Sequence, residues 1–69
     1  MTIEECVGCQ VCLLIPCGPA MLAYHCQLYH ESDNMYFMKV SNKHEVFFNS
    51  ANVSTIERHR CTVCITLKD

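Results

Sequence analysis

The residues best suited to chemistry in this chain are its cysteines, which occur seven times in 69 residues. Four of them lie close together in the stretch EECVGCQVCLLIPCGP, at positions 6, 9, 12 and 17. The others are Cys26, Cys61 and Cys64, and His30 follows Cys26 by one helical turn in sequence. Thiols at this density and spacing are typical of metal sites, iron–sulfur clusters or disulfide scaffolds.

The start of the chain favours metal over disulfides. Residues 1 to 5 carry two acids instead of a basic segment, and Cys6, Cys9 and Cys12 interrupt any apolar run, so no secretory signal is predicted. An odd number of cysteines also leaves one thiol unpaired in any disulfide scheme. We therefore expect an intracellular protein, in the cytoplasm or nucleus, whose reduced thiols are available as metal ligands.

Four pairs of donors can be recognised in the sequence. Two cysteines in a tight C-x2-C turn bind metal well because both side chains converge on one ion. Seven cysteines and one histidine supply eight donors, which fill the shells of two tetrahedral zinc ions. The predicted pairs are Cys6/Cys9, Cys12/Cys17, Cys26/His30 and Cys61/Cys64. The register Cys9/Cys12 stays open, as does replacement of a ligand by His25, His44 or His59.

Two groupings of these pairs are open. In an interleaved arrangement, Cys6/Cys9 joins Cys26/His30 at one zinc ion, and Cys12/Cys17 joins Cys61/Cys64 at the other. In a sequential arrangement, the first two pairs share one ion and the last two share the second. We favour interleaving because a cross-link between distant parts of the chain removes most entropy from the unfolded state.

Two partial resemblances to known families suggest alternatives. The order of the four pairs resembles that of RING-like zinc domains, which implies a ubiquitin-transfer adaptor, although no C-x2-C follows His30. The run from Cys6 to Cys12 resembles the bacterial ferredoxin motif C-x2-C-x2-C-x3-C-P, which implies a [4Fe–4S] electron carrier. Here the last gap is four residues, and Gly18 separates Cys17 from the following proline.

The elements expected to position these donors form one α+β domain spanning residues 1–69. Pro19 suits the first position of a helix, and the apolar periodicity predicts a helix over about 20–31. Short segments rich in aromatic and branched residues predict an antiparallel sheet. Its expected strands cover about 35–40, 45–48, 53–60 and 63–67. The helix and the sheet are expected to pack around zinc.

Composition and charge limit the partners. Five basic and seven acidic residues give a net charge of −2, which argues against a general nucleic-acid binder. A local basic spot at Arg58, His59 and Arg60 keeps a nucleic-acid-binding zinc finger as an alternative. No apolar run is long enough to cross a membrane. With thiolates filling both zinc shells we expect no catalytic site, and hence no enzyme.

A protein is the partner that we expect. The apolar residues Leu13, Leu14 and Ile15 lie between two predicted ligands, so the loop that carries them would be presented at low entropic cost. The alternative interpretation is that these three residues form the small core. The main hypothesis is therefore an intracellular module with structural zinc that mediates protein–protein interaction.

Overall fold

The computed structural model describes residues 2–69 and consists almost entirely of β-strands. The strands are β1 (Gln10–Cys17), β2 (Ala20–Ser32), β3 (Met35–Ser41), β4 (His44–Asn49), β5 (Val53–His59) and β6 (Thr62–Leu67). Two short 3-10 turns, η1 (Glu4–Cys6) and η2 (Ser50–Asn52), complete the described part. The α+β prediction is therefore wrong. No helix within residues 2–69 has the length and apolar character needed to span a bilayer.

All six strands belong to one mixed sheet in the order β4-β3-β2-β1-β6-β5. Neighbours are antiparallel except β1 and β6, which run parallel and pair from Val11↔Val63 to Leu14↔Thr66. The strands predicted near 35–40, 45–48, 53–60 and 63–67 coincide with β3 to β6 within one residue at each end. The sequence prediction missed β1 and its parallel pairing.

The segment predicted as a helix is the long strand β2. It pairs with β1 from Gln10↔Gln27 to Cys17↔Ala20, so the two strands form a hairpin around Gly18 and Pro19. Gly18 has a φ of 61°, as the first central residue of a type II′ turn requires. The φ of proline, near −65°, suits the second position. Gly18-Pro19 therefore turns the chain back on itself instead of starting a helix.

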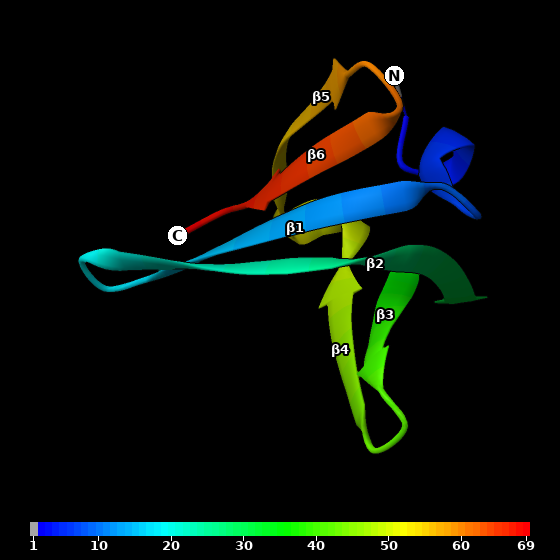
Figure 1. The fold of residues 1–69 in the computed structure, drawn as a ribbon, viewed down its shortest axis with the longest axis horizontal. Coiled ribbons are helices and arrows are strands. Elements are labelled where there is room, and N and C mark those ends of the chain that lie inside the picture. Colours follow the sequence, from blue (N-terminus) through cyan, green and yellow to red (C-terminus); the bar gives the residue numbers. More distant parts are fainter. Residues whose placement is uncertain (1) are drawn as a thin grey trace.

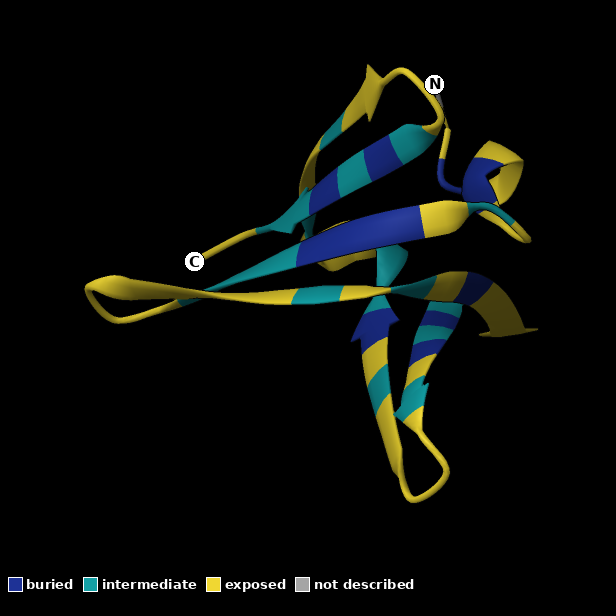
Figure 2. Cartoon of the chain, viewed as in Figure 1, coloured by how far each residue is buried: buried dark blue, intermediate teal, exposed yellow. Residues whose placement is uncertain are grey.

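The sheet bends strongly, so that β3 and β4 lie at a steep angle to β1 and β6 (Figure 1). The core lies on its inner face. There Val11, Leu13, Val63 and Ile65 from one half are completely or almost completely buried. The other half contributes Leu28, Tyr36, Met38 and Phe48, and the N-terminal segment adds Ile3, just before η1, and Cys6 at the end of η1. Burial alternates along β3 and β6 (Figure 2), as expected for strands with one face turned to the core.

Candidate metal site

One row of side chains crosses four strands on the outer face of the sheet. In the strand register, His25 of β2 lies opposite Cys12 of β1. Cys12 lies opposite Cys64 of β6, and Cys64 lies opposite Glu57 of β5. Residues directly opposite each other project from the same face of a sheet. We call these four residues the outer row; all four are of types that bind metal ions.

Cys12 lies at the centre of the contacts in the outer row. Its Sγ atom is 3.9 Å from Nε2 of His25. Two ligand atoms of a tetrahedral zinc ion, one sulfur and one nitrogen, lie about 3.6 Å apart, given bond lengths of about 2.3 and 2.05 Å. The observed separation therefore differs from a ligand separation by a few tenths of an ångström. Cys12 itself is 8% exposed, whereas His25 and Glu57 are open to solvent and Cys64 is half-buried.

The surroundings of Cys12 keep its thiol protonated in the metal-free protein. Burial raises the pKa of Cys12, and the neighbouring Cys64 raises it further through its charge and a hydrogen bond. A cation reverses this balance because it favours the thiolate, so metal binding would release protons. Within residues 2–69, no three His, Cys, Asp or Glu side chains already surround a common point. A metal ion at the outer row would therefore need its side chains to rearrange.

The first predicted set of four ligands, which joins Cys6/Cys9 to Cys26/His30, does not surround one point. Cys6 is fully buried, and its thiol donates to the carbonyl oxygen of Thr2 at 3.4 Å. Burial raises the pKa of Cys6, with a further contribution from Cys9. Cys26 lies opposite Val11, on the inner face of the sheet.

His30, the fourth member of that set, makes other contacts. Its Nε2 atom lies 2.9 Å from the carbonyl oxygen of Asp33, and its ring packs against Tyr36 with centroids 4.9 Å apart. These contacts turn the imidazole toward the β2–β3 turn.

The second predicted set of four ligands, which joins Cys12/Cys17 to Cys61/Cys64, does not come together at one place. Cys12 and Cys64 are neighbours, but Cys17 is exposed at the far end of β1 and Cys61 is exposed in the turn between β5 and β6. Cys17 is five residues beyond Cys12 along a strand, a distance of about 16 Å. The imidazole that contacts Cys12 belongs to His25. The sequence predicts His25 only as a possible replacement for another ligand, because its position opposite Cys12 depends on the hairpin turn.

The two other histidines that could replace a ligand, His44 and His59, do not contact Cys12. The ring of His44 packs edge-on against Tyr24, with centroids 6.3 Å apart. His59 lies opposite Thr62 and 4.0 Å from a carboxylate oxygen of Glu57. Neither contact involves a thiol.

The predicted partner residues and the basic spot are split between faces. Leu13 is completely buried and Ile15 packs against the core, whereas Leu14 is half-buried and, one residue along the strand, lies on the outer face. Arg58 and His59 are successive strand residues and project from opposite faces. Neither triplet forms a single contact surface.

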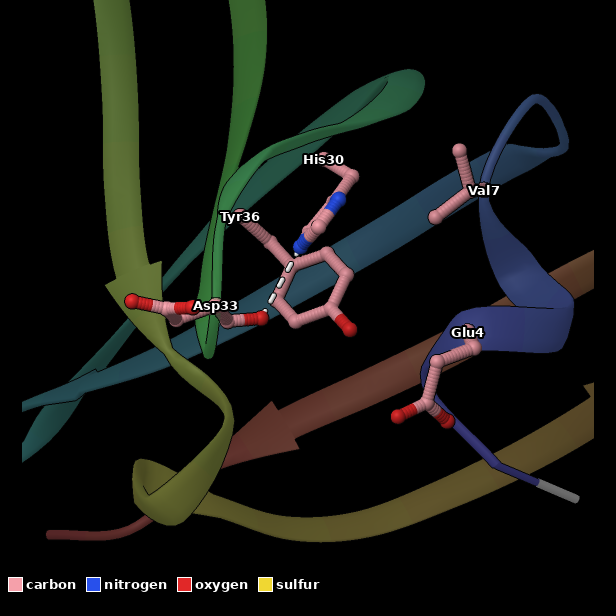
Figure 3. Close-up of a pocket in the computed structure, with 5 residues that line it drawn as sticks. All are labelled: Glu4, Val7, His30, Asp33 and Tyr36. Carbon is pink, nitrogen blue, oxygen red and sulfur yellow. Dashed lines mark hydrogen bonds between the residues drawn. The ribbon is translucent and has the colours of Figure 1, made fainter.

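A pocket of about 300 Å³ lies between η1 and the β2–β3 turn (Figure 3). It is lined by Glu4, Val7, His30, Asp33 and Tyr36. Burial raises the pKa of Tyr36, and the charge of Glu4 adds to the effect. The pocket contains no cysteine and none of the four residues of the outer row, so the two features are separate.

Comparison of the chain with protein-family models, with curated proteins and with solved structures gave no match. Its function must therefore be inferred from the chemistry of its own residues. Among the cysteines and histidines, the outer row provides the closest approach of thiol to imidazole.

Proposed function

We propose that this protein is a zinc-binding module with one structural ion on the outer face of the sheet, bound by Cys12, Cys64 and His25. Glu57, next in the outer row, is the fourth ligand. The observation that carries the proposal is the parallel pairing of β1 and β6, which sets Cys12 opposite Cys64 while His25 lies 3.9 Å from the Cys12 sulfur. Thiolate and imidazole together are a typical zinc ligand set.

A zinc ion at this position would stabilise the fold efficiently. It would join β1 and β2 to β6, and Cys12 and Cys64 are far apart in the chain. Closing such a long loop removes much conformational entropy from the unfolded state. Because the ligands are assembled only in the folded protein, the free energy of binding adds to the free energy of folding. We therefore assign the ion a structural role, with protein interaction as the function of the module.

The two alternative functions, an iron–sulfur electron carrier and a RING-like adaptor, each need a different arrangement of the thiols. A [4Fe–4S] cluster bound through the ferredoxin-like run would need Cys6, Cys9 and Cys12 around one point. Cys6 is buried in the core, whereas Cys12 lies on the outer face of β1. A RING-like arrangement needs two complete sets of four ligands, and the described residues offer one row. The geometry therefore favours a single zinc site.

Metal titration of the reduced protein tests the proposal. We expect native mass spectrometry to show one zinc ion per chain, and Co²⁺ to give the absorption of a tetrahedral site with thiolate ligands. Cys12→Ser and Cys64→Ser should each weaken binding more than about 100-fold, since loss of an outer-shell partner alone costs 10- to 100-fold. His25→Ala should also weaken it.

Matched variants control for the general effect of removing a thiol or an imidazole. Cys17→Ser and Cys61→Ser remove exposed cysteines outside the outer row, and His44→Ala removes an exposed histidine. All three should bind zinc like the unmodified protein. Circular dichroism of each metal-free variant checks that the sheet is retained. The proposal is wrong if the reduced protein binds no zinc, or if Cys17→Ser or Cys61→Ser weakens binding as much as Cys12→Ser.

A further inference from the structure

Half of the long strand β2 is paired on one side only. Residues 20–27 pair with β1, whereas β3 begins to pair with β2 at Leu28. Within residues 2–69, no strand pairs with the other side of residues 20–27. This segment and the end of β1 project from the body of the molecule as a two-stranded ribbon (Figure 1). We call the unpaired side of residues 20–27 the β2 free edge.

The β2 free edge lacks the features that usually protect an exposed strand. Natural proteins discourage pairing at sheet edges with charged side chains, prolines or bulges. Between Glu5 and Glu31 the chain contains no Asp, Glu, Lys or Arg, and residues 20–27 contain no proline. The edge strands β4 and β5, in contrast, carry charges such as Glu45 and Arg58. The two ends of the sheet are therefore protected, and the β2 free edge is not.

Apolar side chains accompany the unpaired backbone on both faces. Met21 is 52% exposed and Leu22 is 45% exposed. As successive residues of a strand they project from opposite faces. The ring of Tyr24 packs edge-on against that of His44 in β4, so the ribbon has a tertiary contact of its own before it meets a partner. A preordered edge loses less conformational entropy on binding.

We propose that the β2 free edge pairs with the same edge of a second copy of this chain, antiparallel and about a two-fold axis. An edge without charges has no electrostatic means of repelling its own copy or of selecting a charged partner. Two-fold pairing is closed, so it uses up both edges and stops at a dimer. Seven residues from each copy, 20–26 or 21–27, would form six to eight interstrand hydrogen bonds, roughly one per paired residue. Met21 and Leu22 would lie against side chains of the second copy, one on each face.

The molar mass in solution tests this proposal, measured by sedimentation equilibrium on the full chain in reducing buffer, with and without zinc. Reducing conditions prevent dimers linked through Cys17. The unmodified protein should have the mass of a dimer. Met21→Lys and Leu22→Lys should each give a monomer with an unchanged β-sheet spectrum, because a buried lysine on either face opposes pairing. Phe47→Lys is the matched control: Phe47 is 49% exposed on the edge strand β4, and its variant should remain dimeric.

Amide hydrogen exchange on the unmodified protein gives an independent measurement. Alternate amides of residues 20–27 should exchange more slowly as the protein concentration rises. A monomeric unmodified protein would overturn the proposal, and so would a dimer that survives Leu22→Lys or that Phe47→Lys disrupts. Exchange in residues 20–27 that does not depend on concentration would also overturn it. Cys12→Ser should lose zinc but stay dimeric, so failure of the zinc proposal and failure of this one can be distinguished.

Discussion

Leu13 and Leu14 are adjacent in sequence and identical in type, but their surroundings differ completely. Leu13 is fully buried on the inner face, among core residues such as Val11 and Ile65. Leu14 is half-buried on the outer face. Replacing each with alanine removes the same atoms, so the two variants compare the two faces of β1 directly. We expect Leu13→Ala to be strongly destabilising and Leu14→Ala to be nearly neutral.

The magnitude follows from burial. Truncating a completely buried leucine costs about 3 kcal/mol, because apolar contacts are lost and a cavity remains. A domain of 69 residues is stable by roughly 3 to 10 kcal/mol. Leu13→Ala therefore removes a large part of the total and should lower Tm by roughly 10 to 25 °C. Leu14→Ala, at a partly solvated position, should cost less than about 1 kcal/mol.

Urea unfolding followed by far-ultraviolet circular dichroism measures both costs, with thermal unfolding as a second measurement. The m-value should stay constant, so that a change in midpoint reports a change in stability. The reasoning would be refuted if Leu14→Ala cost as much as Leu13→Ala. That result would mean that residues 13–15 are displayed as a loop, or that the strand faces are reversed.

Two further predictions concern the thiols and the turns. Burial is the main cause that raises the pKa values of Cys6 and Cys12 in the folded protein above their ordinary value of 9.0. The unfolding free energy of the metal-free protein should therefore be constant below about pH 9. It should fall as the pH rises further, because unfolding then releases protons. Urea unfolding as a function of pH should show this slope, which Cys6→Ala should reduce. Arg60 has a φ of 60° in the turn between β5 and β6; Arg60→Gly should raise the unfolding free energy by up to about 1 kcal/mol, because glycine adopts positive φ without strain. A lower midpoint for Arg60→Gly in urea would contradict this.

The sequence located β3 to β6 well because their local signals agree with their tertiary surroundings. Residues 35–41 are rich in aromatic and branched side chains and end at a polar turn. Residues 62–67 have apolar side chains at every second position. The segment 20–32 differs. It is rich in alanine, leucine, methionine and glutamine, which favour helix, yet its pairing with β1 overrides this propensity. The deciding residue is Gly18, because Gly-Pro forms a hairpin turn as readily as Pro begins a helix.

The candidate site was predictable only in part, for a related reason. The approach of Cys12 to Cys64 joins distant parts of the chain and depends on the parallel pairing of β1 with β6. No local pattern in the sequence specifies that register. His25 depends on the hairpin turn in the same way. C-x2-C spacing, by contrast, indicates a metal site only where the chain turns tightly, and Cys9 and Cys12 are separated by the start of a strand.

Successive side chains of β1 point to opposite faces of the sheet, so this short strand contributes both to the core and to the outer row. Val11, Leu13 and Ile15 belong to the inner set and build the core, whereas Cys12 and Leu14 belong to the outer set. Cys6 closes the core from the inner side. Cys6 lies in the core and Cys12 on the outer face of β1, so the two thiols do not face a common point. Cysteines that are close in sequence are therefore separated in space by the strand, and the thiol nearest to Cys12 comes from β6.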